Sequence, residues 1–212
     1  MTATVQTLQD LPAEAAPEDQ TRAAIYGLLA RLLYAAPDQE LLHIVAQSDD
    51  IAAHAHSSPL GQAWRALQMG SEVADEDALA DEFQQLFIGL GQGEVIPYMS
   101  WHLTGFLMEE PLARLRDDLA ELGLARMDAV NEPEDHMAAV LEVMRFLLAG
   151  DSAALPGALE KQQQFFDKHL RSWYGLCAAQ IEVAPSANYY RLVARMLRAF
   201  LDVEAQSFDM AS

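Results

Sequence analysis

NEPEDHMAAVLEVMRFLL, residues 131–148, decides how this chain folds, because a compact turn signal directly precedes a strongly apolar helical stretch. Proline is favoured at the first helical position and pushes the residue before it out of the α region. We therefore expect Glu132 to be the N-cap and the helix to begin at Pro133. Glu134 and Asp135 then lie in the first turn, where the helix dipole stabilises negative charge. The apolar residues that follow at helical spacing predict one buried stripe: Met137, Val140, Leu141, Met144 and Leu148.

The sequence on both sides of this stretch shows the same helical spacing of apolar residues. Prolines and glycines interrupt the spacing, most clearly in GLGQGEVIPY (89–98), and short alternating strand patterns are scarce. This pattern predicts an all-α fold, a helical bundle of about eight to ten helices in two packed subdomains joined by a hinge.

The expected domain organisation follows these interruptions. Residues 1–19, rich in Ala, Pro and acids, are predicted to form a flexible tail. An N-terminal helical subdomain with the hinge loop should cover 20–130, and a C-terminal helical subdomain should cover 131–212, together forming one domain. A flexible hinge makes exchange of halves between chains inexpensive, so we expect a monomer with a minor domain-swapped dimer.

Charge and cysteine content limit the partners and the compartment. The net charge is -19, which disfavours nucleic acid and anionic membranes and suits a basic peptide, although acidity also simply keeps proteins soluble. Cys177 is the only cysteine, which excludes an internal disulfide and any multi-cysteine metal site. Without a signal-peptide pattern or a long apolar run, the chain is expected to be cytoplasmic and not inserted in a membrane.

The histidine and carboxylates of the turn also raise the question of catalysis. Asp135 beside His136 could form an acid–base pair, but a nucleophile or metal must complete such a site. The Glu-x-x-His spacing of di-metal bundles occurs once, at Glu40 and His43, and the second half is missing. We predict a protein that is not an enzyme and has no cofactor, with a carboxylate-rich helical-bundle metalloenzyme as the alternative.

Three motifs in a fixed order carry a resemblance to a known family. LADEFQQLFIGLG (79–91) contains F-x-x-L-F-x-G, IPYMSWHLTGFL (96–107) contains P-Y-x-S, and E-P-x-D-H follows at 132–136. In this order the chain resembles the TorD/DmsD/NarJ family of cytoplasmic chaperones for molybdenum-cofactor oxidoreductases. The resemblance covers nearly the whole chain, including the C-terminal helices.

The resemblance implies a client-binding function. Such a chaperone binds the apo form of a molybdoenzyme catalytic subunit, commonly through its twin-arginine signal peptide, and holds it until the cofactor is inserted. Proteins of molybdenum-cofactor biosynthesis are further possible partners, and a NarJ-type chaperone for the body of a cytosolic molybdoenzyme is the alternative within the family. Carried over by motif, the expected client-binding residues are Glu132, Pro133, Asp135, His136, Phe83, Leu86, Phe87, Tyr98, Ser100, Trp101, Arg22 and Tyr26.

Overall fold

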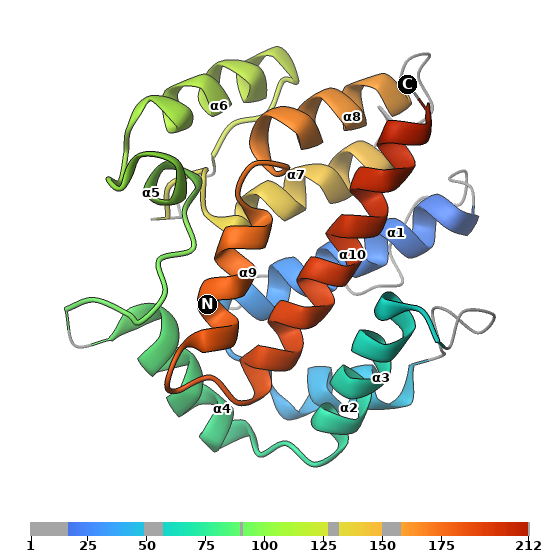
Figure 1. Ribbon diagram of the computed structural model, residues 1–212, viewed down its shortest axis with the longest axis vertical. Helices are drawn as coiled ribbons and strands as arrows, with labels where there is room; N and C mark the ends of the chain where they lie inside the picture. The colour runs from blue at the N-terminus through green and yellow to red at the C-terminus, as the bar shows by residue number, and fades with distance from the viewer. Residues whose placement is uncertain (1–16, 49–56, 90, 127–131, 150–157, 212) are drawn as a thin grey trace.

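The fold is all-α, as the sequence predicts. A computed structural model describes residues 17–89, 91–126, 132–149 and 158–211, except for 49–56 within the first range. Ten α-helices and one short π-helix occur in these residues (Figure 1). Their bounds are α1 Pro17–Tyr34, α2 Gln39–Gln47, α3 Pro59–Glu72, α4 Glu76–Phe83, the π-helix η1 Gln84–Ile88, α5 Met99–Thr104, α6 Glu110–Glu121, α7 Met137–Ala149, α8 Ala158–His169, α9 Tyr174–Val183 and α10 Tyr189–Ala211.

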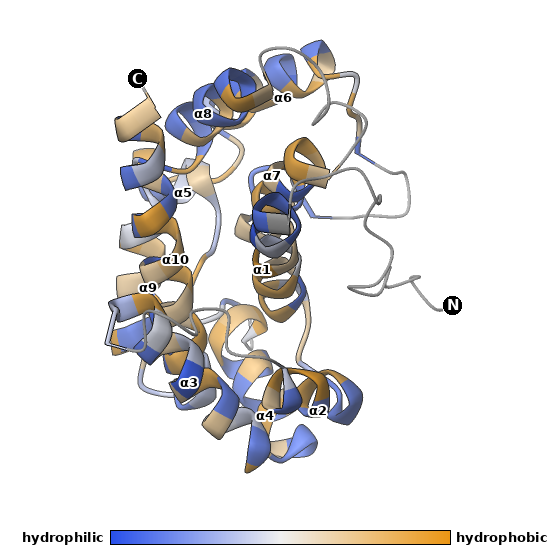
Figure 2. Cartoon of the chain, turned by 90° about the vertical axis from the view of Figure 1, so that its right-hand side faces the viewer, coloured by the Kyte–Doolittle hydropathy of each residue, from blue (hydrophilic) through white to orange (hydrophobic). Residues whose placement is uncertain are grey.

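Helices from distant parts of the chain pack against each other. α1 lies along α7, and α10 packs on both α3 and α9. Figures 1 and 2 show α6 and α8 at one end of the molecule and α2, α3 and α4 at the other. One hydrophobic core runs through the described residues from Ala23 to Phe208. The core therefore includes helices from both expected subdomains, and their division at residue 131 stays a prediction.

Helix α7 lies at the centre of this core. All five residues of its predicted stripe are fully buried: Met137, Val140, Leu141, Met144 and Leu148. Side chains on neighbouring faces of α7, such as Ala138 and Leu147, are buried as well. A helix that is apolar over most of its circumference belongs in the interior, which is why α7 can pack on α1 and also on α8.

The start of α7 differs from the sequence prediction. The helix begins at Met137, four residues after the expected Pro133, and residues 132–136 form a turn. The Met99 amide donates to the Asp135 carbonyl at 2.9 Å, and the Met137 amide donates to the Pro97 carbonyl at 2.8 Å. These bonds form an isolated antiparallel bridge between Tyr98 and His136. The Asp135 carbonyl and the Met137 amide are therefore hydrogen-bonded to a distant segment and are not available to extend α7 toward its N-terminus.

The first helix also starts earlier than the predicted end of the tail. α1 begins at Pro17, so residues 17–19 of the predicted tail lie in a helix, and the boundary of the tail stays a prediction. Proline at the first position and two acids, Glu18 and Asp19, in the first turn are favourable at a helix N-terminus. The remainder of the predicted tail, 1–16, lies outside the described residues.

The glycine-rich segment folds back on η1. Gly89, with φ of +64°, ends the π-helix by donating its amide to the Gln84 carbonyl at 2.7 Å. A Cβ on Gly93 would lie 2.5 Å from the Leu86 carbonyl oxygen, so only glycine allows this close approach. The Val95 amide then donates to that same Leu86 carbonyl at 2.8 Å. This segment is tied to η1, and its role as a hinge stays a prediction.

Candidate functional site

The E-P-x-D-H turn holds the N-terminus of α5. The Asp135 carboxylate accepts hydrogen bonds from the Ser100 amide at 2.9 Å and the Ser100 hydroxyl at 2.5 Å. The residue at the N-cap of α5, Tyr98, makes no side-chain cap of its own. Asp135 therefore caps α5 from another part of the chain, and it is only 1% exposed. A carboxylate in this position is stabilised by the free amides and the dipole of the helix.

His136 has a corresponding role at the start of α7. Its Nδ1 accepts from the Ala138 amide at 3.1 Å, which places the proton of the neutral ring on Nε2. The ring packs edge-on against Tyr98, with centroids 4.9 Å apart. Burial lowers the pKa of His136 to about 4, outweighing the opposite effect of the nearby Glu132 and Asp135 carboxylates. The imidazole is consequently neutral at pH 7 and acts as a helix cap.

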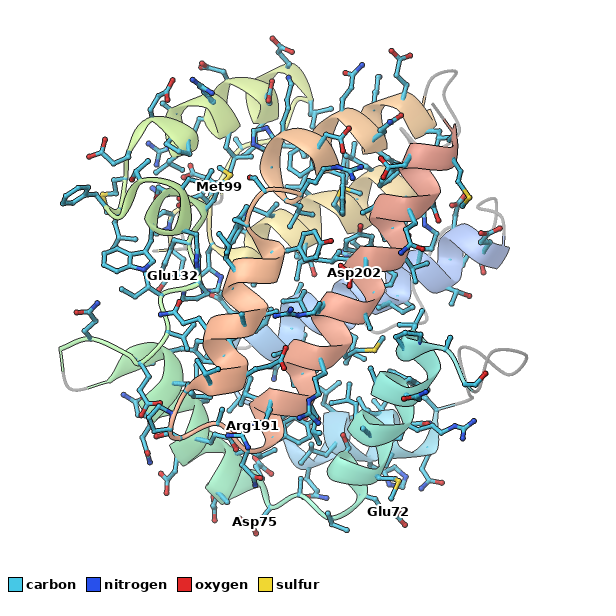
Figure 3. The ribbon with its side chains drawn as sticks, viewed as in Figure 1. Glu72, Asp75, Met99, Glu132, Arg191 and Asp202 are labelled. Atoms are coloured by element: carbon cyan, nitrogen blue, oxygen red, sulfur yellow. The ribbon has the colours of Figure 1, made fainter. Side chains whose placement is uncertain are left out.

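Glu132 contacts Tyr98, the residue at the N-cap of α5. The Tyr98 hydroxyl donates to its carboxylate, and Figure 3 shows Glu132 between α5 and the segment after η1. Burial and this hydrogen bond raise the pKa of Tyr98, so the phenol stays protonated as the donor. Glu132 is only partly buried, and a carboxylate has lone pairs for further donors.

An open groove of about 400 Å³ is lined in part by Tyr98, the residue whose hydroxyl donates to Glu132. One wall comes from the end of η1 and the glycine-rich segment, and the other comes from α5 and the segment after it. Three predicted client-binding residues, Phe87, Tyr98 and Trp101, line the groove together. Its lining also includes residues that the sequence did not single out as site residues: Ile88, Gly91, Gln92, Gly93, Val95, Ile96, Pro97 and Leu107.

Two other predicted residues lie behind the groove wall. Leu86 is fully buried in the core. The Phe83 ring packs 5.0 Å from that of Phe87 and 5.8 Å from that of Tyr190. Phe83 and Leu86 thus support the position of Phe87, and neither contributes to the groove lining.

Arg22 and Tyr26 belong to a different contact, between α1 and α10. Arg22 donates from Nε and Nη2 to the two oxygens of Glu204, both at 2.8 Å, and the Tyr26 hydroxyl donates to the same carboxylate at 3.0 Å. The guanidinium also lies 5.7 Å from the centroid of the Phe208 ring. The structure therefore places these two residues in an inter-helix network and does not bring them into the groove.

A carboxylate that the sequence did not single out fixes the start of the longest helix. Glu82 accepts from the amides of Asn188 and Tyr190 at 2.8 Å and from that of Tyr189 at 3.1 Å. Glu82 is buried in α4, next to Phe83 in the F-x-x-L-F-x-G motif. No local pattern around 82 points to residues 188–190, since the cap joins segments more than a hundred residues apart.

Metal and thiol chemistry have little support in the described part of the chain. Among those residues, no group of three or more His, Cys, Asp and Glu side chains is placed to hold a metal ion. Burial raises the pKa of Cys177 to about 12, which keeps it as a thiol. No described helix is both long and apolar enough to cross a membrane.

The helical arrangement is that of a known class of folds. The chain superposes on the crystal structure of a candidate redox enzyme maturation protein from Archaeoglobus fulgidus with a TM-score of 0.52 and 18% identity. That alignment covers 93% of this chain and 99% of the other, so the two proteins share their overall fold.

Sequence comparison then gives the family. Residues 53–179 match the family model described as nitrate reductase delta subunit, and the chain belongs to this family. It is 29% identical over 137 residues to the chaperone protein TorD of Vibrio cholerae, covering 62% of each chain. It is also 29% identical over 124 residues to the chaperone protein TorD of Actinobacillus succinogenes, covering 58% of this chain and 61% of that one. The matched region spans about three fifths of the length of these relatives.

Proposed function

We propose that the protein is a redox-enzyme maturation chaperone that acts in the cytoplasm. Its client is the apo form of a molybdenum-cofactor oxidoreductase of the DMSO-reductase type, bound through a twin-arginine signal peptide until the cofactor is inserted. The observation that carries the proposal is the open groove with Phe87, Tyr98 and Trp101 in its lining, where Tyr98 is also hydrogen-bonded to Glu132. Relatives named as TorD chaperones support the same function.

The chemistry of the groove suits a peptide that is basic at one end and apolar beyond it. A guanidinium forms strong, often bidentate hydrogen bonds with a carboxylate. Glu132 is partly exposed and can accept such bonds in addition to the one from Tyr98. Aromatic rings in the lining provide large apolar contact area for the following segment. The net charge of -19 would also speed the approach of a basic peptide at low salt.

The E-P-x-D-H turn itself supports a binding function over a catalytic one. Oδ2 of Asp135 accepts both hydrogen bonds from Ser100, Oδ1 is buried without a hydrogen-bond partner among the described residues, and His136 Nδ1 accepts from Ala138. Both side chains are buried, so neither offers a free base to a substrate in this arrangement. Through Glu132 the turn contacts Tyr98 of the groove lining, and through Asp135 it caps α5, which carries Trp101.

Co-purification from the native cells tests this function. Tagged protein should retain an apo-molybdoenzyme that still carries its signal peptide, identified by mass spectrometry, and should release the cofactor-loaded form. Retention of a client that lacks its signal peptide with unchanged affinity would favour binding to the enzyme body, the NarJ-type alternative. Failure to retain any molybdoenzyme would contradict the proposed function.

Titration calorimetry with the client's signal peptide tests the groove. Glu132→Gln should weaken binding about tenfold or more, roughly 1.4 kcal/mol, because the amide loses the charge that pairs with arginine. Glu121→Gln, an exposed change on α6, is the control and should bind as the wild type does. Equal binding by the two variants would exclude Glu132 from the site.

A further inference from the structure

An unusual concentration of exposed apolar side chains lies between α5 and α6. Leu103, Phe106, Leu107 and Met108 are 43%, 67%, 45% and 72% exposed. We call these four residues the apolar lip. Single exposed apolar side chains are normal on a protein, but four within six positions form a patch of the kind that marks an interaction surface.

The apolar lip is continuous with the groove. Leu107 belongs to the lip and also lines the groove. Ile88, which is exposed as well, lines the groove from the end of η1. A bound chain could therefore leave the groove and remain on apolar surface.

Two hydrogen bonds connect the start of the lip to α5. The Gly105 amide donates to the Trp101 carbonyl at 2.8 Å, and Gly105 has a φ of +81° that ends the helix. The Thr104 hydroxyl accepts from the Phe106 amide at 3.2 Å. Because Asp135 caps the other end of α5, the E-P-x-D-H turn sets the position of the lip through this short helix.

The charges around the lip define what it can bind. Glu109, which directly follows Met108, is exposed, and Glu132 accepts a hydrogen bond from Tyr98 of the groove lining. The arginines of the adjacent helix are paired with glutamates: Arg114 with Glu110 and Arg116 with Glu134. An apolar surface edged by carboxylates complements a peptide in which positive charge adjoins an apolar segment.

We propose that the apolar lip binds the apolar segment that follows the arginine pair of the client's signal peptide. This inference rests on the proposed function, and it adds Leu103, Phe106, Leu107, Met108 and Ile88 to the binding surface. Methionine and other flexible apolar side chains adapt to partners of varied sequence. Such a surface selects for hydrophobicity and length, while the carboxylates select for the basic pair.

Calorimetric titration with three synthetic peptides tests the lip. The first peptide carries two adjacent arginines before a leucine- and alanine-rich segment. The second keeps the arginines and has serines in place of the leucines, and the third keeps the apolar segment and has glutamines in place of the arginines. The lip variants are Leu107→Ser and Met108→Ser, and the matched controls are Leu176→Ser on α9 and Met69→Ser on α3, which change side chains that are 54% and 69% exposed.

The lip variants should bind the first and third peptides about tenfold or more weakly than the controls do, a change of roughly 1.4 kcal/mol. Their affinity for the second peptide should not change, because it lacks the apolar side chains. If the lip variants and the controls bind these peptides with the same affinity, the proposal that the lip binds the apolar segment is wrong. Wild-type preference for the first peptide over the third would in that case still support the proposed function.

Three further results separate the two proposals. The wild type could bind the first and third peptides with equal affinity while the lip variants bind both more weakly. This result would support binding of the apolar segment by the lip and would contradict recognition of the arginine pair. If the wild type binds none of the three peptides, the proposal for the lip is wrong. The co-purification experiment would still decide the proposed function. A lip variant that changes sedimentation of the protein and leaves peptide binding unchanged would identify a second copy as the occupant, which also overturns this proposal.

Discussion

Asp135 shows how burial changes the function expected of a motif residue. Its place in the sequence predicts an accessible carboxylate in a first helical turn, available to a client. In the structure its carboxylate is buried and receives two hydrogen bonds from Ser100. Asp135 therefore holds α5, while Glu132 accepts from Tyr98 and is partly exposed.

Replacing Asp135 should lower stability. In Asp135→Ala the amide and hydroxyl of Ser100 lose their acceptor in a buried position, which costs about 1–3 kcal/mol. Urea denaturation measures this cost. Ser100→Ala removes only one of the two bonds and should cost less, and Asp117→Ala, an exposed change on α6, should cost almost nothing. If Asp135→Ala unfolds at the wild-type urea concentration, its carboxylate is not a structural cap.

His136 should make stability depend on pH. Its pKa is about 4 in the folded protein, against 6.5 when unfolded, because burial disfavours the imidazolium. The unfolded chain therefore binds more protons between these values, and stability falls as the pH decreases from 6.5 toward 4, by about 3 kcal/mol at most. Above pH 6.5 both states are neutral at this position and the effect is absent.

Urea denaturation at pH 7.5 and pH 5 measures this dependence. His136→Asn keeps an acceptor for the Ala138 amide but does not titrate, so its loss of stability between the two pH values should be smaller. Some loss should remain, because burial also lowers the pKa of His102 and of His169. The same loss in variant and wild type would exclude His136 as the source.

At the scale of helices, two of them depend on caps supplied by other parts of the chain. α5 is capped by Asp135, and α10 is capped by Glu82. The helical spacing of apolar residues in both segments is visible in the sequence. Neither cap can be predicted from it, because each cap joins positions that are distant in the chain. α2 and α3 instead use adjacent residues, Asp38 and Ser58, as their N-caps.

Glu82→Ala should destabilise the α10 end of the molecule. Three backbone amides at the helix start lose their acceptor, two of them in buried surroundings, at a cost of about 1–3 kcal/mol or more. The neighbouring change Asp81→Ala removes an exposed carboxylate and is the control. Thermal melts of the two variants measure the difference. Equal melting temperatures would contradict a capping role for Glu82.

At the scale of the whole molecule, the first and last helices are joined by a nearly buried ion pair. Arg22 is mostly buried and Glu204 almost completely so, and Tyr26 donates to the same carboxylate. This network ties α1 to α10, whereas the family resemblance carried Arg22 and Tyr26 over as client-binding residues. The client-binding role of both residues stays a prediction.

Removing one partner of this pair should cost more than removing both. Arg22→Leu leaves the Glu204 carboxylate buried without its cation, which typically costs about 3–5 kcal/mol. In Arg22→Leu with Glu204→Leu no unpaired charge remains, so part of that stability should return. Chemical denaturation measures both variants. A double variant less stable than the single one would show that the pair is a net source of stability.

Binding of the signal peptide by the double variant distinguishes the two roles of Arg22. If Arg22 only joins helices, the folded double variant should bind the peptide with wild-type affinity. A tenfold loss of affinity in this folded variant, together with normal binding by Leu176→Ser, would instead support the role implied by the resemblance.

The sequence alone determines the all-α class, the buried stripe of α7 and the importance of residues 132–136, because helical periodicity and turn chemistry are local properties. The order of the three motifs along the chain also predicts that Tyr98, Trp101 and Phe87 form one site with that turn. Only the tertiary structure decides that α7 starts at Met137, that Asp135 and Glu82 are caps, and that Arg22 faces Glu204. Hydrogen bonds and ion pairs between distant segments have no periodic signature, and they form only once packing has brought those segments together.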